Sequence, residues 1–160
     1  MNRESTDPLQ WEEMTWEAVR DLDRERVVAI LPVGAVEAHG PHLPLGTDVI
    51  IGAAMARAGA AHLRRAGWMA VVLPPVWYSA APFASDFPGT VGLHPDTVTR
   101  MILEIAASLA AQGVRAVAVA NAHLDPTHLA SLAKARSEAT EQGITLVAPA
   151  LVRRRHAERL

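Results

Sequence analysis

The sequence contains no cysteine, so disulfides and thiolate metal ligands are excluded, and any metal must be held by His, Asp and Glu. No apolar run approaches the roughly 20 residues that a membrane span needs. Residues 1–7 are polar and of mixed charge, unlike a signal peptide. Neither sign of charge is in excess, because 15 Lys and Arg residues stand against 17 Asp and Glu residues, whereas a nucleic-acid-binding protein shows a basic patch or stripe. These absences predict a cytoplasmic protein with neither a membrane nor a nucleic-acid partner.

The length of the chain predicts one domain. Its 160 residues, half of them apolar, are enough for a single compact unit with a core, and we assign residues 1–160 to it. The one basic cluster, Arg153 to Arg155, is flanked by His156 and Glu158. We interpret it as the solvated face of a helix that begins in the last ten residues.

Apolar runs alternate with helical segments along the chain. Four runs predict strands, at residues 26–33, 68–73, 114–120 and 144–148. A short helix is expected within residues 1–24, and longer ones at 47–65, 96–111 and 126–141, the first of these capped by Thr47 or Asp48. This alternation predicts an α/β fold, a parallel sheet of about four strands with helices on both faces.

Two loops that follow apolar strands carry potential metal ligands. The first contains Glu37, His39 and Asp48, and the second contains His123 and Asp125. In a parallel sheet both loops emerge at the same edge, where ligands bind, and they meet if the first and third predicted strands are neighbours. Residues two apart in extended backbone point the same way, so each closely spaced pair can face one site. Five such donors around two ions, with one bridging carboxylate, would leave open positions for water or substrate.

The first loop and its strand resemble the signature of the creatininase family. The matching segments are Glu37 to Pro44 (E-A-H-G-P-H-L-P), the pair Thr47-Asp48, and the preceding Leu31 to Gly34 (L-P-V-G). The resemblance implies a three-layer α/β sandwich, often hexameric, that hydrolyses C–N bonds of small amides with water activated by two divalent ions. It also implies ligation by Glu37, His39 and Asp48, with Asp48 as the bridge. Zn²⁺ is the first expectation, and Mn²⁺ or Fe²⁺ are alternatives.

A long loop, residues 76–94, is expected to contact the substrate, because loops of this length in compact domains are usually functional or mobile. Its segment Phe87 to Thr90 is similar to the substrate-loop motif of the family. The candidate substrate-loop residues are Tyr78, Ser79, Phe87, Gly89 and Thr90. The aromatic residues of this loop can line a pocket, or they can seal the loop onto the sheet or onto a neighbouring subunit. The catalytic proton donor is not identified, although His42 is a candidate.

The second loop departs from the family pattern. His123 matches the family's ligand, and Asp125 stands where creatininase places a carboxylate one methylene longer. Family members also carry a later His-Ala-Gly…Glu-Thr segment that this sequence lacks, so we expect the C-terminal portion of the family fold to be absent and activity to be weak or absent. His128 can support a ligand, although a solvated turn fits the sequence better.

Three functional hypotheses follow. The first is a metal-dependent amidohydrolase acting on non-peptide C–N bonds, including cyclic amides. A creatininase-like peptidase or deformylase is the alternative within this class. The alternative from another class is a non-catalytic metal-binding or assembly subunit, motivated by the missing segment. A nucleotide-binding domain is disfavoured, because no Gly-rich phosphate loop follows the first strand.

Overall fold

The computed structural model describes residues 9–148. Its centre is a sheet of five strands, all parallel, in the order β1-β3-β2-β4-β5. The strands are β1 (Leu9–Gln10), β2 (Val27–Val33), β3 (Met69–Val72), β4 (Ala116–Asn121) and β5 (Leu146–Val147). The helices are α1 (Trp16–Arg20), α2 (Thr47–Arg65), α3 (Pro95–Ala111) and α4 (Pro126–Glu141), with short 3₁₀ turns η1 (Trp11–Glu13), η2 (Arg24–Arg26) and η3 (Pro82–Ala84).

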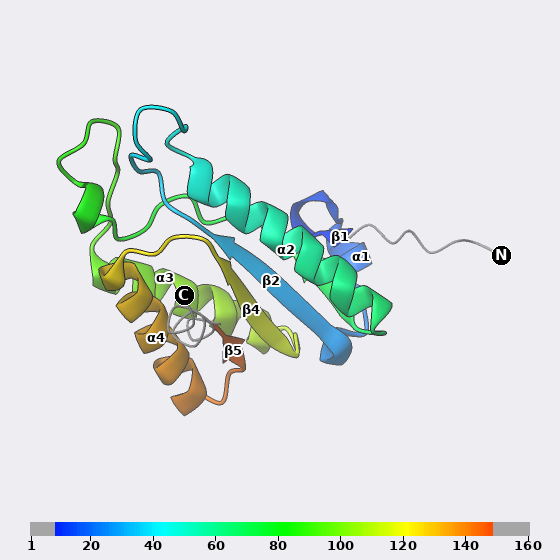
Figure 1. Ribbon diagram of the computed structural model, residues 1–160. Helices are drawn as coiled ribbons and strands as arrows, with labels where there is room; N and C mark the ends of the chain where they lie inside the picture. The colour runs from blue at the N-terminus through cyan, green and yellow to red at the C-terminus, as the bar shows by residue number, and fades with distance from the viewer. Residues whose placement is uncertain (1–8, 149–160) are drawn as a thin grey trace, which may run out of the picture.

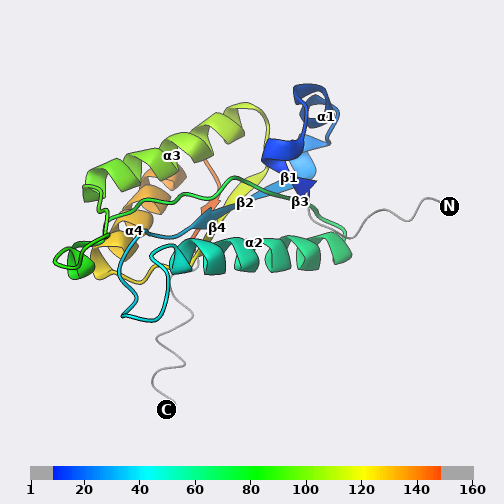
Figure 2. The same cartoon turned by 90° about the horizontal axis from the view of Figure 1, so that it is seen from above.

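The elements form three layers. Helix α2 covers one face of the sheet, and α3 and α4 cover the other, as Figures 1 and 2 show from two directions. The predicted parallel sheet with helices on both faces is therefore confirmed. Strand β1, which pairs with β3 at the edge, is the addition to the four predicted strands. The predicted final helix and the basic cluster at 153–155 lie outside the described residues. Within residues 9–148, no helix combines the length and apolar character that crossing a bilayer requires.

Strand β2 lies at the centre of the sheet, and this explains its composition. It pairs with β3 on one side and β4 on the other, and both of its faces are covered by helices. A strand buried on both faces is expected to read as a continuous apolar run, and six of its seven residues are buried. The run ends at Val33, and the chain then leaves the sheet edge as the loop that carries Glu37 and His39.

Helix α2 packs very closely on the sheet, because the positions that face it are small. Its buried residues include Asp48, Gly52, Ala56 and Ala60, spaced four apart and therefore on one face. The close approach continues at Gly34, just after β2. A Cβ atom there would lie 2.5 Å from the backbone nitrogen of Val49. Gly34 therefore allows the first turn of α2, with Asp48, to lie against the end of β2.

The first residues of the helices account for the positions of two acidic side chains, Asp48 and Asp125. Helices α3 and α4 begin with Pro95 and Pro126, where a proline is best tolerated. The N-cap of α4 is Asp125, whose side chain accepts from the backbone N–H of Thr127. The expected cap of α2 by Thr47 or Asp48 is wrong. Gly46 occupies that position and has no side chain to form a cap, and the Asp48 side chain is directed to His39 and His123 instead.

Candidate metal centre

The two ligand-bearing loops emerge side by side. Strands β2 and β4 are neighbours, and Val33 pairs with Asn121 at their carboxyl ends. The condition on which the predicted site depends, adjacency of these two strands, is therefore met. The backbone N–H of Ala122 also donates to the carbonyl of Val33 (3.1 Å). This bond holds the beginning of the second loop against the end of β2.

Four of the five predicted ligands meet at one point. Glu37, His39 and Asp48 form a group that can hold a metal ion, and His123 joins it from the loop that follows β4. Asp48 Oδ1 lies 3.0 Å from His39 Nε2, and Asp48 Oδ2 lies 3.0 Å from His123 Nδ1. Glu37 Oε1 lies 3.1 Å from His123 Nδ1 and 3.9 Å from His39 Nε2. Donors about 2.0–2.2 Å from a common ion are separated from one another by roughly 3.0–3.6 Å, so most of these separations suit a coordination shell.

Both imidazoles are oriented by backbone carbonyls. The carbonyl of Glu37 accepts from His39 Nδ1 (3.0 Å), and the carbonyl of Ala80 accepts from His123 Nε2 (2.9 Å). A carbonyl can only accept, so these nitrogens carry the hydrogens. In each neutral ring the other nitrogen then has a lone pair directed at a carboxylate, which also only accepts. Such an arrangement requires a cation, either a proton or a metal ion, between the ring and the acid.

The electrostatics of the group agree with that requirement. Burial alone would lower the pKa of His123, but its hydrogen bonds to Asp48 and Ala80 and the nearby acid charges raise that pKa above the usual value. Burial would raise the pKa of Asp48, but hydrogen bonds from His123 and His39 hold it below the usual value. For Glu37, burial is the largest cause and raises the pKa. Two carboxylates and two imidazoles suit a divalent ion such as Zn²⁺ or Mn²⁺.

The fifth predicted ligand, Asp125, lies in a different set of contacts. Its Oδ1 accepts from the N–H of Thr127 (2.7 Å), and its Oδ2 accepts from the N–H of Phe83 (3.0 Å). These bonds lower the pKa of Asp125, although burial works in the opposite direction. The side chain therefore connects the start of α4 to the loop 76–94. A carboxylate retains lone pairs beyond two such bonds, so ligation by Asp125 stays a prediction.

Sequence reasoning missed a buried polar network beneath the centre. His128 is completely buried, contrary to the expected solvated turn. Its Nδ1 is hydrogen-bonded to Ser79, and its Nε2 donates to Asn121 Oδ1 (2.9 Å). Burial is the main cause that lowers the pKa of His128 to about 3, so the ring is neutral. The available signal was the position of His128 in the first turn of α4, three residues after Asp125.

The predicted substrate loop lies against the first ligand loop. The N–H of Ala38 donates to Thr90 Oγ1 (3.1 Å), and the N–H of Val91 donates to the carbonyl of Val36 (2.9 Å). Gly89 has a φ of +91°, and a Cβ there would meet Leu45 at 2.6 Å. The side chains of this loop divide into two groups. Phe83 (88%), Phe87 (61%) and Tyr78 (48%) are strongly exposed, whereas Ser79 is buried against His128.

His42 is also exposed, at the tip of the ligand loop. Its ring lies close to Gly40, where an added Cβ would be 3.4 Å from His42 Nδ1. A catalytic role for His42 stays a prediction.

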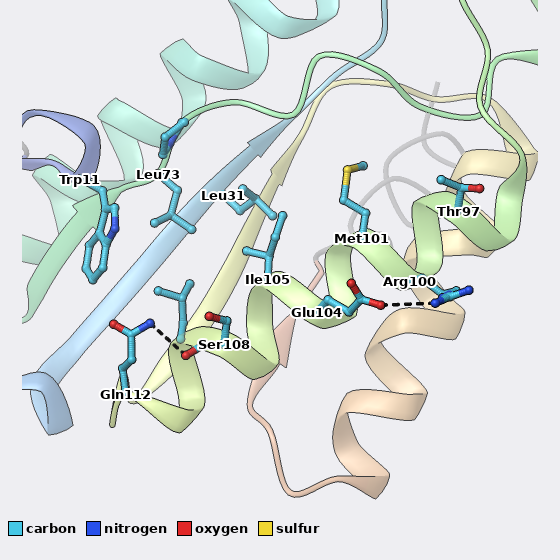
Figure 3. A pocket seen from close by; sticks show the side chains of 12 residues that line it. Trp11, Leu31, Leu73, Thr97, Arg100, Met101, Glu104, Ile105, Ser108 and Gln112 are labelled. Carbon is cyan, nitrogen blue, oxygen red and sulfur yellow. Dashed lines mark hydrogen bonds and ion pairs between the residues drawn. The ribbon is translucent and has the colours of Figure 1, made fainter.

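A separate cavity of about 790 Å³ lies between η1, α3 and the sheet. Figure 3 shows its lining, in which Leu31, Leu73 and Ile105 face Trp11 across the hollow. The polar side chains there bond mainly within α3, as Gln112 does to the carbonyl of Ser108 (3.1 Å). None of the candidate ligands lines this cavity, so the carboxylate–imidazole group is kept as the candidate functional site.

Fold and site together define a class of protein, a parallel three-layer α/β protein with a carboxylate–imidazole group that can hold a metal ion at the carboxyl ends of neighbouring strands. A model of the creatininase family, described as creatinine amidohydrolase, matches residues 12–159. The chain belongs to this family, as its resemblance predicted.

Curated relatives and solved structures agree with the assignment. The chain is 35% identical over 100 residues to the mycofactocin precursor peptide peptidase of Mycobacterium ulcerans, covering 59% of this chain and 39% of that protein. It is 32% identical over 119 residues to the creatinine amidohydrolase of Pseudomonas putida, covering 71% and 44%. A creatininase structure of a Zn–Zn type shares 28% identity with a TM-score of 0.70, covering 88% of this chain and 57% of that one. A manganese creatininase matches equally well (27%, TM-score 0.70, with the same coverage). The chain thus spans 39–44% of the length of these two curated relatives and 57% of each of the two solved chains.

Proposed function

We propose that the protein is a metal-dependent hydrolase of C–N bonds in small amides, including cyclic amides. One observation carries the proposal. His39 and His123, from separate loops, are each held by a backbone carbonyl so that their second nitrogen faces Asp48. Histidines that bind metals usually donate their other N–H in this way, which fixes the tautomer and the ring orientation.

Each carboxylate of the group has a separate proposed role in holding metal ions. Asp48 directs one oxygen toward each imidazole, which supports a dinuclear arrangement with Asp48 shared, Glu37 beside His123, and Asp125 completing the second position. Divalent ions held there supply an acidified water and a Lewis acid that polarises the carbonyl of the substrate. Zn²⁺ is the first candidate, and Mn²⁺ or Fe²⁺ are alternatives.

Substrate contacts are assigned to the exposed side of the long loop. Tyr78, Phe87, Gly89 and Thr90 lie on the segment bonded to the ligand loop through Ala38. Ser79 is buried and its hydroxyl is bonded to His128, so it supports the shape of this loop instead of contacting the substrate through its hydroxyl. His42 is the candidate proton donor, since its imidazole is free to reach solvent at the tip of the ligand loop.

A hydrolysis panel tests the proposal. The chain, loaded with Zn²⁺ or Mn²⁺, is assayed on cyclic amides, formamides and short peptides, beside Asp48→Asn and the surface control His62→Ala. We expect turnover of an amide by the wild type and the control, and its loss in Asp48→Asn. A wild type that binds metal but turns over no member of the panel contradicts the proposal and favours a non-catalytic metal-binding or assembly subunit.

Peptide hydrolysis is the second candidate. It is favoured by the 35% identity to the mycofactocin precursor peptide peptidase, and the exposed aromatic residues of the loop suit an extended substrate. Cleavage of short peptides with no action on cyclic amides would select this alternative.

We also propose that the protein acts as a homo-oligomer, a hexamer by analogy with its family. Large apolar side chains are exposed on the outer side of α2, at Ile50, Ile51 and Met55, and at the neighbouring Trp77. Exposed apolar side chains that gather on one element are typical of protein–protein contacts. Light scattering after gel filtration checks the assembly state.

A further inference from the structure

His128 is joined to the metal centre by hydrogen bonds, although it offers no atom to an ion. Its ring is completely buried and lies 4.8 Å, centroid to centroid, from the ring of His123. Asn121 Oδ1, an acceptor, takes the hydrogen of His128 Nε2 (2.9 Å). His128 Nδ1 must therefore be the acceptor for the hydroxyl of Ser79.

Both partners of His128 act directly on His123. The side chain of Asn121 accepts from the backbone N–H of His123 (3.2 Å) and donates to its carbonyl (2.7 Å). Ser79 immediately precedes Ala80, whose carbonyl orients the ring of His123 (2.9 Å). One buried ring thus connects the group that holds the His123 backbone with the segment that holds the His123 side chain.

The donor and the acceptor of each hydrogen bond in this network are fixed by the chemistry of the groups. No buried side-chain nitrogen or oxygen within residues 9–148 lacks a hydrogen-bond partner. A fully satisfied polar network in a low-dielectric interior restricts its members to one arrangement. Replacing the ring by an apolar group leaves the buried Ser79 hydroxyl without its acceptor and removes one of the two donors to Asn121 Oδ1, so both groups can adopt another geometry.

We propose that His128 is a positioning residue that sets the orientation of His123 toward the metal, through Asn121 on one side and Ser79–Ala80 on the other. The proposal rests on the proposed metal-dependent function, but it concerns metal affinity rather than turnover. Residues that hold ligands in this way typically contribute 10–100-fold to metal affinity.

Two substitutions of His128 separate positioning from packing. His128→Leu removes both hydrogen-bonding atoms, whereas His128→Gln keeps a donor and an acceptor. His62→Leu, at an exposed position of α2, is the matched control. Zn²⁺ affinity is measured on the full chain by competition with a chromophoric chelator at a temperature where all variants are folded, and Co²⁺ absorption bands report the coordination geometry.

We expect the control to keep the wild-type affinity, His128→Leu to bind Zn²⁺ about 10–100-fold more weakly with altered Co²⁺ bands, and His128→Gln to recover most of the loss. A variant His128→Leu that unfolds more easily but keeps the affinity and the Co²⁺ spectrum overturns the proposal. If His128→Leu does not fold, Ser79→Ala takes its place, with an expected loss of about tenfold; an unchanged affinity overturns the proposal equally.

These readouts keep the two proposals distinguishable. A wild type that binds Zn²⁺ without hydrolysing any amide contradicts the proposed function alone, because the affinity ratios remain measurable. Turnover with equal affinities in all variants contradicts the positioning role alone. A wild type that does not bind Zn²⁺ overturns both.

Discussion

The contact between Gly34 and the start of α2 makes a quantitative test of how the metal centre is built. A Cβ added at Gly34 would lie 2.5 Å from Val49 N, 2.7 Å from the carbonyl carbon of Asp48 and 2.8 Å from Val49 Cα. Ordinary contact begins at 3.4 Å, so in Gly34→Ala the two backbones must separate by about 0.6–0.9 Å. All three neighbours are backbone atoms, and no side-chain rotation relieves the overlap.

The displacement acts directly on a proposed ligand. Asp48 lies in the segment that must move, and its oxygens are 3.0 Å from His39 and His123. A site of this kind needs its groups held within about 0.5 Å of the productive geometry. We therefore expect Gly34→Ala to lose at least about tenfold in Zn²⁺ affinity and about 1–3 kcal/mol in the free energy of unfolding.

Two other glycines supply the controls. At Gly59, also in α2, an added Cβ meets only Ile30 Cδ1 at 3.7 Å, so Gly59→Ala should gain about 0.5–1 kcal/mol from helix propensity. At Gly52 the nearest atom, the carbonyl oxygen of Val33, is 3.1 Å away, which predicts an intermediate effect. Urea unfolding without metal and chelator competition for Zn²⁺ measure both quantities. The reasoning is refuted if Gly34→Ala matches Gly59→Ala in stability and in affinity.

Three further predictions concern single side chains. Because His128 has a pKa of about 3 in the folded chain and about 6.5 when unfolded, its contribution is complete above pH 6.5 and falls as the pH decreases. The stability advantage of wild type over His128→Gln, measured by metal-free urea unfolding, should shrink by about 2 kcal/mol between pH 7.5 and 5; a constant difference contradicts this. Asp125→Asn should keep the helix cap but reduce the Zn²⁺ stoichiometry from two to one, whereas Asp125→Ala should also cost about 1 kcal/mol; two ions in both variants would remove Asp125 from the ligands. Thr90→Val removes the acceptor for Ala38, which should cost about 1 kcal/mol and raise KM more than it lowers kcat, and unchanged kinetics would contradict the assigned contact.

The convergence of the candidate ligands was predictable because it follows from topology. Apolar runs identified strands β2 and β4, and alternation with helices required them to be parallel. Their loops then had to emerge at one edge. The sequence left open only whether the two strands were neighbours, and the pairing of Val33 with Asn121 is the answer.

The features that sequence reasoning missed depend on contacts between distant segments. Strand β1 has two residues, too few for a detectable period, and its existence depends on the free edge of β3. The burial of His128 depends on Ser79, 49 positions away. Asp125 could be read as a helix cap or as a ligand from its neighbours alone, and only the fold reveals that the N–H of Phe83 also uses its carboxylate.

Metal binding and hydrolysis place different demands on this chain. The four converging donors lie on loops that follow the central strands β2 and β4 or in the first turn of α2. Backbone carbonyls orient the two imidazoles, and the pairing of Val33 with Asn121 holds the two loops together. The substrate side is different, because Phe83 and Phe87 are mostly exposed and make no pocket wall by themselves. We therefore expect affinity for an ion to depend on the described fold, and affinity for an amide to depend also on what covers the loop. A strong metal site combined with a high KM for the amide is the expected result.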